Sequence, residues 1–172
     1  MNETLNTLMN RRSIRKFKPQ QITDSELSAV IDAGLYAPSA KAQQPWKFVV
    51  VQNEAEREEV YALNKKLRGM NDPYYSAPTV ILVFAEKDAI APLCDAALAM
   101  GNMMNAAYSL GIGTCWIHGE KEMFETEEGK SLMKKWGVGE EYIGVGSIAL
   151  GYADCEHPKA PKRREDRVVY IK

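Results

Sequence analysis

The 172-residue sequence predicts a single domain that mixes helices with strands. Three observations support this prediction. Residues 23–26 (Thr-Asp-Ser-Glu) form a capping box, and apolar residues follow it at helical spacing. Residues 46–51 and 79–85 are continuous apolar runs, which are typical of buried strands. Residues 90–110 are rich in Ala and Met and carry one charge, Asp95, so they predict a long helix that is buried on most sides.

The other elements follow in chain order from local patterns. Residues 3–10 predict a short helix with Leu5 and Leu8 on one side, and the helix that starts at the capping box stops at Pro38. Asn53 caps a charged helix that runs to about Leu67. The remaining expected elements are a loop at 69–78, a short strand at 114–117, an exposed helix at 127–136, a long strand at 142–152 and a last strand at 168–171.

Composition and charge exclude several classes of protein. The hydrophobic content of 45% and the charged content of 26% exclude wholesale disorder, and a net charge of −1 argues against a general polyanion-binding surface. Three cysteines cannot form a disulfide framework, so a reducing, cytoplasmic location is expected. Residues 1–10 have no apolar run of a signal peptide, and polar residues interrupt the stretch 89–119, so we expect no membrane association.

Ten of the 22 basic residues lie in two short segments near the ends of the chain. The first contains Arg11, Arg12, Arg15, Lys16 and Lys18, and the second contains Lys159, Lys162, Arg163, Arg164 and Arg167. Either segment could be a solvated charged loop. However, Ser13 lies within the first segment, and guanidinium and hydroxyl groups both donate to phosphate oxygens. We therefore interpret the two segments as candidate anion-binding sites.

The expected long helix poses a geometric problem, because one small domain can hardly cover every face of it. Its small and flexible side chains would allow close packing against a second copy of the chain, which predicts a homodimer. The alternative is a central helix that its own sheet surrounds. The side chains concerned are Ala96, Ala99, Met100, Met103, Met104 and Ala107.

Several motifs of known chemistry do not fit their context. Residues 144–149 match the G-x-G-x-x-A pattern of dinucleotide-binding turns but lie inside an expected strand, and residues 129–131 (Gly-Lys-Ser) lack the rest of a phosphate-binding loop. Cys115 and His118 are too few for a zinc site, and Cys115 in an apolar strand is more typical of an inert thiol than of a nucleophile. We expect no metal, and any chemistry would come from a bound phosphorylated cofactor.

Six segments, in this order and at these distances, resemble the FMN-dependent nitroreductase family across nearly the whole chain. They are residues 11–15 (RRSIR), 37–40 (APSA), 44–46 (QPW), 76–78 (SAP) ahead of an apolar strand, 110–117 (LGIGTCWI), and 161–164 (PKRR) ahead of Val168 and Val169. The resemblance implies an α+β fold in which helices flank a mainly antiparallel sheet. It also implies that residues 1–172 form one domain of an intertwined homodimer, that residues 155–172 extend onto the partner subunit, and that FMN binds at the dimer interface.

The resemblance also assigns roles to individual residues at the two ends of the chain. Arg11 and Ser13 match positions that bind the phosphate and ribityl chain of FMN, and Arg12 adjoins them. Arg15 matches the basic residue at the pyrimidine edge of the flavin, where a cation raises the reduction potential. Two further basic residues, Lys162 and Arg164, match those that close on the phosphate.

Other matching positions would border the flavin ring. The loop that packs against it from the other subunit matches Pro38, Ser39 and Ala40, and the segment whose backbone borders it matches Trp116, Ile117, His118 and Gly119. The backbone amide of His118 or Gly119 would donate to the hydride-accepting nitrogen. Asn71 matches a mid-chain polar contact. One departure concerns the first loop, where Ala42, preceded by Lys41, replaces an asparagine usual in the family.

The resemblance implies an oxidoreductase in which NADH or NADPH binds and reduces FMN. The oxidised nicotinamide then leaves, and a nitroaromatic, a quinone or a similar acceptor binds in its place and is reduced, which gives a ping-pong cycle. Some members of the family catalyse other reactions, so reductive dehalogenation and oxidative flavin cleavage remain alternatives. Two further alternatives are an FMN-storing protein with negligible turnover and a nucleic-acid-binding module that uses the two basic segments. We expect a small-molecule acceptor and no nucleic acid.

Overall fold

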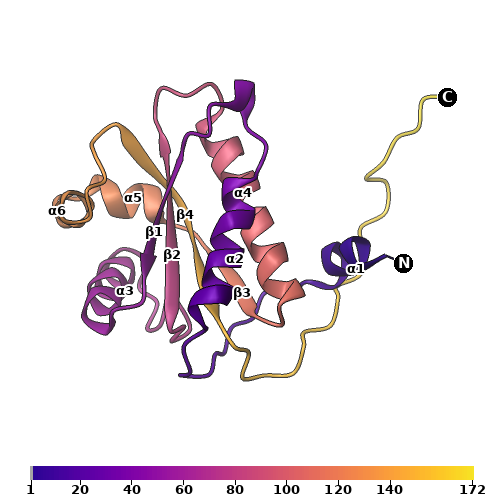
Figure 1. Ribbon diagram of the computed structural model, residues 1–172, viewed down its shortest axis with the longest axis horizontal. Helices are drawn as coiled ribbons and strands as arrows, with labels where there is room; N and C mark the ends of the chain where they lie inside the picture. The colour runs from indigo at the N-terminus through magenta and orange to yellow at the C-terminus, as the bar shows by residue number, and fades with distance from the viewer. Residues whose placement is uncertain (1) are drawn as a thin grey trace.

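The computed structural model describes residues 2–172, in which helices cover both faces of a central sheet (Figure 1). In chain order the elements are α1 (Glu3–Asn10), α2 (Asp24–Leu35), the 3-10 turn η1 (Ala40–Ala42), β1 (Trp46–Val51), α3 (Glu54–Arg68), β2 (Thr79–Glu86), α4 (Pro92–Ser109), β3 (Gly113–Ile117), α5 (Glu120–Glu125), α6 (Glu127–Lys135) and β4 (Tyr142–Gly151).

The sheet has four strands in the order β1-β2-β4-β3, and every neighbouring pair is antiparallel. The expected α+β class with an antiparallel sheet is therefore confirmed. Residues 144–149 lie within β4, which confirms that the G-x-G-x-x-A pattern is not a dinucleotide-binding turn. Its glycines serve packing instead, because a Cβ atom on Gly144 would lie 2.5 Å from the carbonyl oxygen of Glu120.

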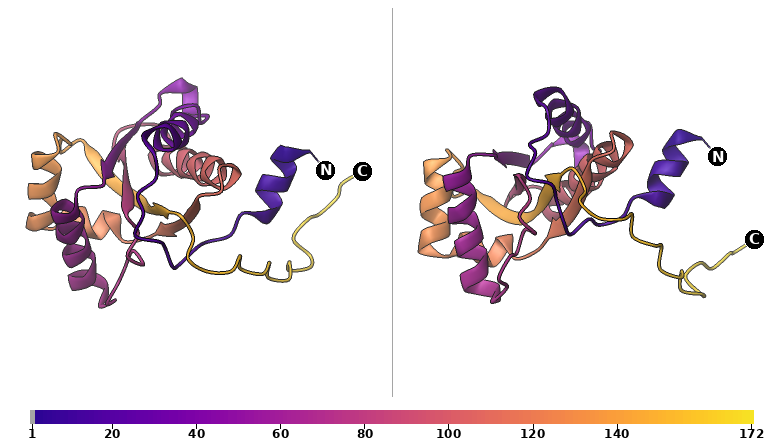
Figure 2. Two further views of the ribbon diagram at one scale, coloured as in Figure 1. Left: turned by 60° about the horizontal axis from the view of Figure 1, so that its bottom comes forward. Right: turned by 90° about the horizontal axis from the view of Figure 1, so that it is seen from below.

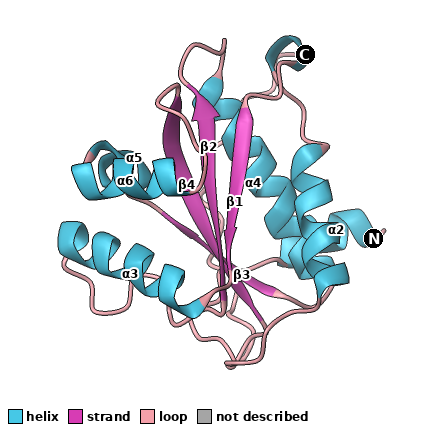
Figure 3. Ribbon diagram, turned by 60° about the vertical axis from the view of Figure 1, so that its left-hand side comes forward, coloured by secondary structure: helices cyan, strands magenta, loops and turns pink. Residues whose placement is uncertain are grey.

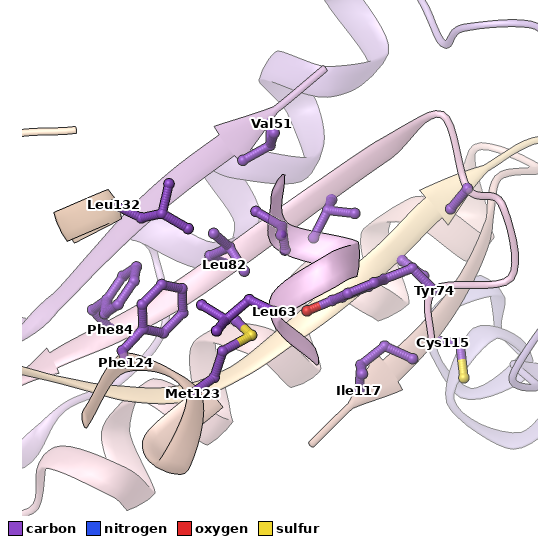
Figure 4. Packing of buried hydrophobic residues seen from close by; sticks show 14 of the residues in the cluster. Val51, Leu63, Tyr74, Leu82, Phe84, Cys115, Ile117, Met123, Phe124 and Leu132 are labelled. Atoms are coloured by element: carbon purple, nitrogen blue, oxygen red, sulfur yellow. The ribbon is translucent and has the colours of Figure 1, made fainter. Parts of the chain in front are cut away.

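Both faces of the sheet are buried, which explains why β2 is apolar without alternation. Helices α3, α5 and α6 lie on one side and α2 and α4 on the other (Figure 3). Leu82 and Phe84 pack into the cluster on the first side, where the ring of Phe84 lies 4.8 Å from that of Phe124 (Figure 4). Ile81 and Val83 pack into the cluster on the second side.

The long helix α4 packs differently from what the sequence suggested. The Ala and Met side chains that were expected to face a second copy are buried within the chain's own core, against the sheet and α2. The alternative, a helix covered by its own sheet, describes this face correctly. The outer face of α4 instead presents Leu93 and Leu98, which are both about half exposed. The packing basis of the dimer prediction was thus wrong, because spacing does not reveal which face meets the sheet.

The two ends of the chain extend away from the body of the molecule (Figure 2). The expected strand at 168–171 is absent from the structure of residues 2–172, in which this segment is extended and pairs with no strand. Its side chains are strongly exposed, up to 91% for Ile171. The prediction of a strand within this chain was therefore wrong, because the segment lies outside the sheet. Whether residues 155–172 extend onto a partner stays a prediction.

Local signals predicted most elements to within a few residues. Thr23 and Glu26 form the expected capping box, and Asn53 caps α3. Helix α5 was missed, because its six residues are too few to show a helical pattern. Among the helices of residues 2–172, none is both long and apolar enough to cross a membrane.

Candidate functional site

The N-terminal basic segment lies alongside β3. The backbone N–H of Ile14 donates to the carbonyl of Thr114 at 2.9 Å, and Ser13 forms an isolated parallel bridge with Thr114. The side chain of Ile14 fits against Gly113, where an added Cβ atom would lie only 2.9 Å from it. These contacts hold the predicted phosphate-binding residues beside the strand that leads to residues 116–119.

Two guanidinium groups in this segment have unused donors. Nη1 of Arg12 donates to the carbonyls of Met9 at 2.9 Å and Arg11 at 2.7 Å, which fixes its orientation. Within residues 2–172, however, Nη1 of Arg11 and Nε of Arg12 are buried and have no hydrogen-bond partner. Leaving a charged donor unpaired is costly, so these atoms suit an anion such as a phosphate group.

The thiol of Cys115 lies near the same segment. Burial raises the pKa of Cys115, while the charge of Arg15, a hydrogen bond to Ser13 and the charge of Arg11 oppose the shift. This raised pKa agrees with the interpretation of Cys115 as an inert thiol rather than a nucleophile. Because Arg15, Ser13 and Arg11 all influence this thiol, they lie near Cys115 on β3.

The chain turns sharply where β3 ends. The ring of His118 lies 5.8 Å from that of Trp116, and Gly119 has a φ of 111°, which favours glycine. The guanidinium of Arg68, at the end of α3, lies over Gly119, because a Cβ atom there would be 2.9 Å from its Nη1. Arg68 could not be predicted at this site, since nothing local in the sequence connects it to this turn.

The loop that contains Pro38, Ser39 and Ala40 is held in a strained conformation. Lys41, Ala42 and Gln44 all have positive φ angles, of 49°, 55° and 49°. The loop is anchored on one side by Asp95, whose two carboxylate oxygens accept from the backbone N–H of Ala40 at 3.2 and 3.1 Å. On the other side, Oγ of Ser39 accepts from the N–H of Gln44 at 2.9 Å.

The anchoring role of Asp95 was not predicted from the sequence. The signal was present, because Asp95 is the lone charge in a helix that is otherwise apolar. A buried charge needs hydrogen-bond partners, and Ala40 supplies one.

A single chain brings only part of the predicted site together. Helix α4 has 18 residues and is therefore about 27 Å long. The loop at Pro38–Ala40 lies beside its first turn, whereas its last turn leads into β3 and the N-terminal basic segment. The two groups of residues are thus at opposite ends of the helix, as Figure 1 also shows.

Within residues 2–172, the remaining predicted residues make no hydrogen bond or ion pair with the N-terminal segment. Nζ of Lys162 pairs with Glu165 at 3.1 Å, and Arg164 is exposed on the extended C-terminal segment. Asn71 is exposed in the loop after α3. Their roles stay predictions. A hollow of about 870 Å³ between β4, α5 and α6 is lined by none of the predicted residues.

Comparison with known proteins identifies the fold and its family. A family model described as "Nitroreductase family" matches residues 8–152. The chain belongs to the nitroreductase family. A curated relative of this nitroreductase-family chain, from Archaeoglobus fulgidus, is 31% identical over 161 residues, which are 91% of this chain and 88% of the relative. That protein is named "Putative NADH dehydrogenase/NAD(P)H nitroreductase".

Solved structures agree with this membership. A nitroreductase from Bacteroides fragilis with bound FMN is 31% identical, with a TM-score of 0.92 over 100% of both chains. A second FMN-bound nitroreductase, from Desulfitobacterium hafniense, is 29% identical, with a TM-score of 0.88 over 100% of both chains. The resemblance and the fold expected from it are confirmed.

Proposed function

We propose that this nitroreductase-family protein is an NAD(P)H-dependent FMN oxidoreductase that reduces nitroaromatic, quinone or similar electrophilic acceptors. One observation carries the proposal. The buried, unpartnered donors of Arg11 and Arg12 lie beside the strand that ends in the segment expected to border the flavin. Solved family structures with bound FMN support the choice of cofactor. The names of curated relatives support NADH or NADPH as the electron donor.

The residues of this chain fit FMN. Arg11, Arg12 and Ser13 would hold the phosphate, and the backbone of residues 116–119 would border the ring. Bound FMN would supply the redox chemistry, in which it accepts a hydride from NAD(P)H and passes electrons to the acceptor. The protein would orient the cofactor and supply positive charge. Arg15 would place a permanent cation near the pyrimidine edge.

The proposal includes a homodimer with FMN at its interface. The loop at Pro38–Ala40 lies at the far end of α4, so it would complete a site only on a second copy. Apolar side chains that a partner would cover lie on the outer faces of α1 and α4 and on the C-terminal segment. They include Leu5, Leu8, Met9, Leu93, Leu98, Val169 and Ile171.

The test is anaerobic reduction of the purified protein. We expect the protein to purify yellow, its flavin absorbance to bleach on addition of NADH or NADPH, and the absorbance to return when a nitroaromatic or a quinone is added. Steady-state rates should give the parallel double-reciprocal lines of ping-pong kinetics. A halogenated phenol in the acceptor panel and a check for loss of intact FMN test the dehalogenating and flavin-cleaving offshoots.

Other outcomes would favour the alternatives. Flavin that binds but is not reduced by either nicotinamide would indicate an FMN-storing protein. A colourless protein that copurifies with nucleic acid, and whose binding depends steeply on salt, would indicate a nucleic-acid-binding module.

Replacing Arg15 should separate chemistry from binding. Arg15→Gln is expected to lower the midpoint potential of bound FMN, because the cation stabilises the electrons that reduction adds. Arg15 is exposed, and an exposed charge pair contributes up to about 1 kcal/mol, which corresponds to about 20 mV for a two-electron couple. Spectroelectrochemical titration measures the shift. Lys18→Gln, an exposed cation of the same segment, is the matched control. An unchanged or higher potential in Arg15→Gln, with FMN still bound, contradicts the role.

A further inference from the structure

Glu120 is a carboxylic acid with no solvent exposure, and it follows Gly119 directly in the chain. Its side chain meets groups from other elements. Oγ of Ser147, on β4, donates to its Oε1 at 2.5 Å, and the hydroxyl of Tyr74 donates to the same oxygen at 3.3 Å. Nδ2 of Asn64, on α3, donates to the hydroxyl of Tyr74 at 3.3 Å. Figure 4 shows Tyr74 within the apolar cluster on this side of the sheet, so the network lies in a dry environment.

The hydrogen bonds of this network leave a place for one more proton. Oε1 of Glu120 receives both donors, whereas Oε2 is buried and has no partner within residues 2–172. A carboxylate oxygen that is removed from water and has no donor is costly. A proton on Oε2 removes this cost because it neutralises the group. Oε2 is therefore the atom at which Glu120 can bind and release a proton.

Few charged groups face this carboxyl. From the elements packed against α5, β4 presents Ser147, the loop at 69–78 presents Tyr74, and α3 presents Asn64 and Arg68. On α6, all charged side chains are exposed: Lys130 pairs with Glu127, Glu128 with Lys66 on α3, and Lys135 with Glu56 and Glu59 on α3, and Lys134 is the remaining exposed cation. Burial raises the pKa of Glu120 to about 7, and the donors Ser147 and Tyr74 and the charge of Arg68 oppose the shift. Near neutral pH the carboxyl is therefore divided between its two protonation states.

We propose that Glu120 takes up a proton whenever bound FMN accepts a hydride. The inference rests on the proposed function, because it needs a flavin at the turn formed by His118 and Gly119. The carboxyl is bound by Ser147, which pairs with Ile117 immediately before this turn, so negative charge added to a ring at the turn favours its neutral form. The hydride carries two electrons and a proton from NAD(P)H to the flavin, and a separate proton moves from solvent to Oε2. When the acceptor takes the electrons, Glu120 returns its proton to solvent.

Proton uptake during reduction tests the proposal. The FMN-bound protein is reduced anaerobically with NADPH in weakly buffered solution, and an indicator dye reports the protons taken up per flavin between pH 5 and 9. Compared with Glu120→Gln, we expect the wild type to take up an additional fraction of a proton per flavin, up to one, with a maximum just above pH 7. The excess vanishes at pH 5, where Glu120 is already protonated. Glu120→Gln should abolish the excess. Glu122→Gln, an exposed position on the same helix, should retain it.

The controls separate the possible failures. Equal uptake in the wild type and Glu120→Gln at every pH, with FMN bound and reduced in both, overturns the inference and leaves the proposed function intact. A wild type that binds no FMN, or that NADPH does not reduce, overturns the proposed function instead. Ser147→Ala should move the uptake maximum to higher pH, because it removes a donor that favours the charged carboxylate. A purely structural Glu120 would not respond in this way.

A second measurement applies if Glu120→Gln does not fold. Infrared difference spectra of the wild type, reduced minus oxidised, are recorded with ¹³C-labelled glutamate. We expect a carboxylate band to be lost and a protonated carboxyl band to be gained, both shifted by the label. The absence of a label-sensitive protonated band between pH 7 and 8 overturns the inference.

Discussion

Replacing Arg11 and Lys162 together by alanine is expected to yield largely FMN-free protein. The two residues come from opposite ends of the chain, and both are predicted to bind the phosphate. Each charge-assisted hydrogen bond contributes roughly 1.5–3 kcal/mol, so the loss of both weakens binding by about 100-fold or more. Dissociation constants from fluorescence titration of the apoprotein, together with flavin content after purification, measure the effect.

The matched control for this double variant removes the same charge from the same two segments. Lys18→Ala with Lys159→Ala takes away one exposed cation near each end, at positions that the family resemblance does not match to a cofactor contact. This protein should keep its FMN. If Arg11→Ala with Lys162→Ala retains full FMN at low protein concentration, the phosphate assignment is wrong.

Deleting residues 168–172 is expected to weaken the dimer and to lower FMN occupancy with it. The segment is apolar and extended, and it has no strand partner in the structure of residues 2–172. An exchange of this segment between subunits would give it backbone hydrogen bonds and apolar contacts. Because the proposed site spans both subunits, loss of the dimer would remove part of each site. Sedimentation velocity and flavin absorbance, measured over a range of protein concentrations, report both effects.

A one-residue truncation serves as the control for this deletion. Removal of Lys172 alone leaves the apolar segment intact and should preserve both the dimer and its FMN. A tight dimer with normal FMN content after deletion of residues 168–172 contradicts the predicted exchange.

Only part of the candidate site could be recognised from local sequence. The segment around Arg11 and Ser13 could be singled out because its residue types lie next to one another, and the structure places it beside β3. Asp95 and Arg68 could not be assigned in this way. Asp95 accepts from a backbone N–H that is 55 residues away in the chain, and Arg68 lies over a glycine on another element. Contacts of this kind leave no periodic pattern.

The sequence by itself determined the types of most helices and strands, together with the capping box of α2. These features depend on hydrogen bonds and apolar spacing within a few residues, which a local pattern records. Only the tertiary structure decided which face of α4 meets the sheet, and that residues 168–171 lie outside it. It alone also decided that Glu120 is buried, since its partners Tyr74 and Ser147 are 46 and 27 residues away. Burial and its electrostatic consequences arise from packing between distant segments, which no local pattern encodes.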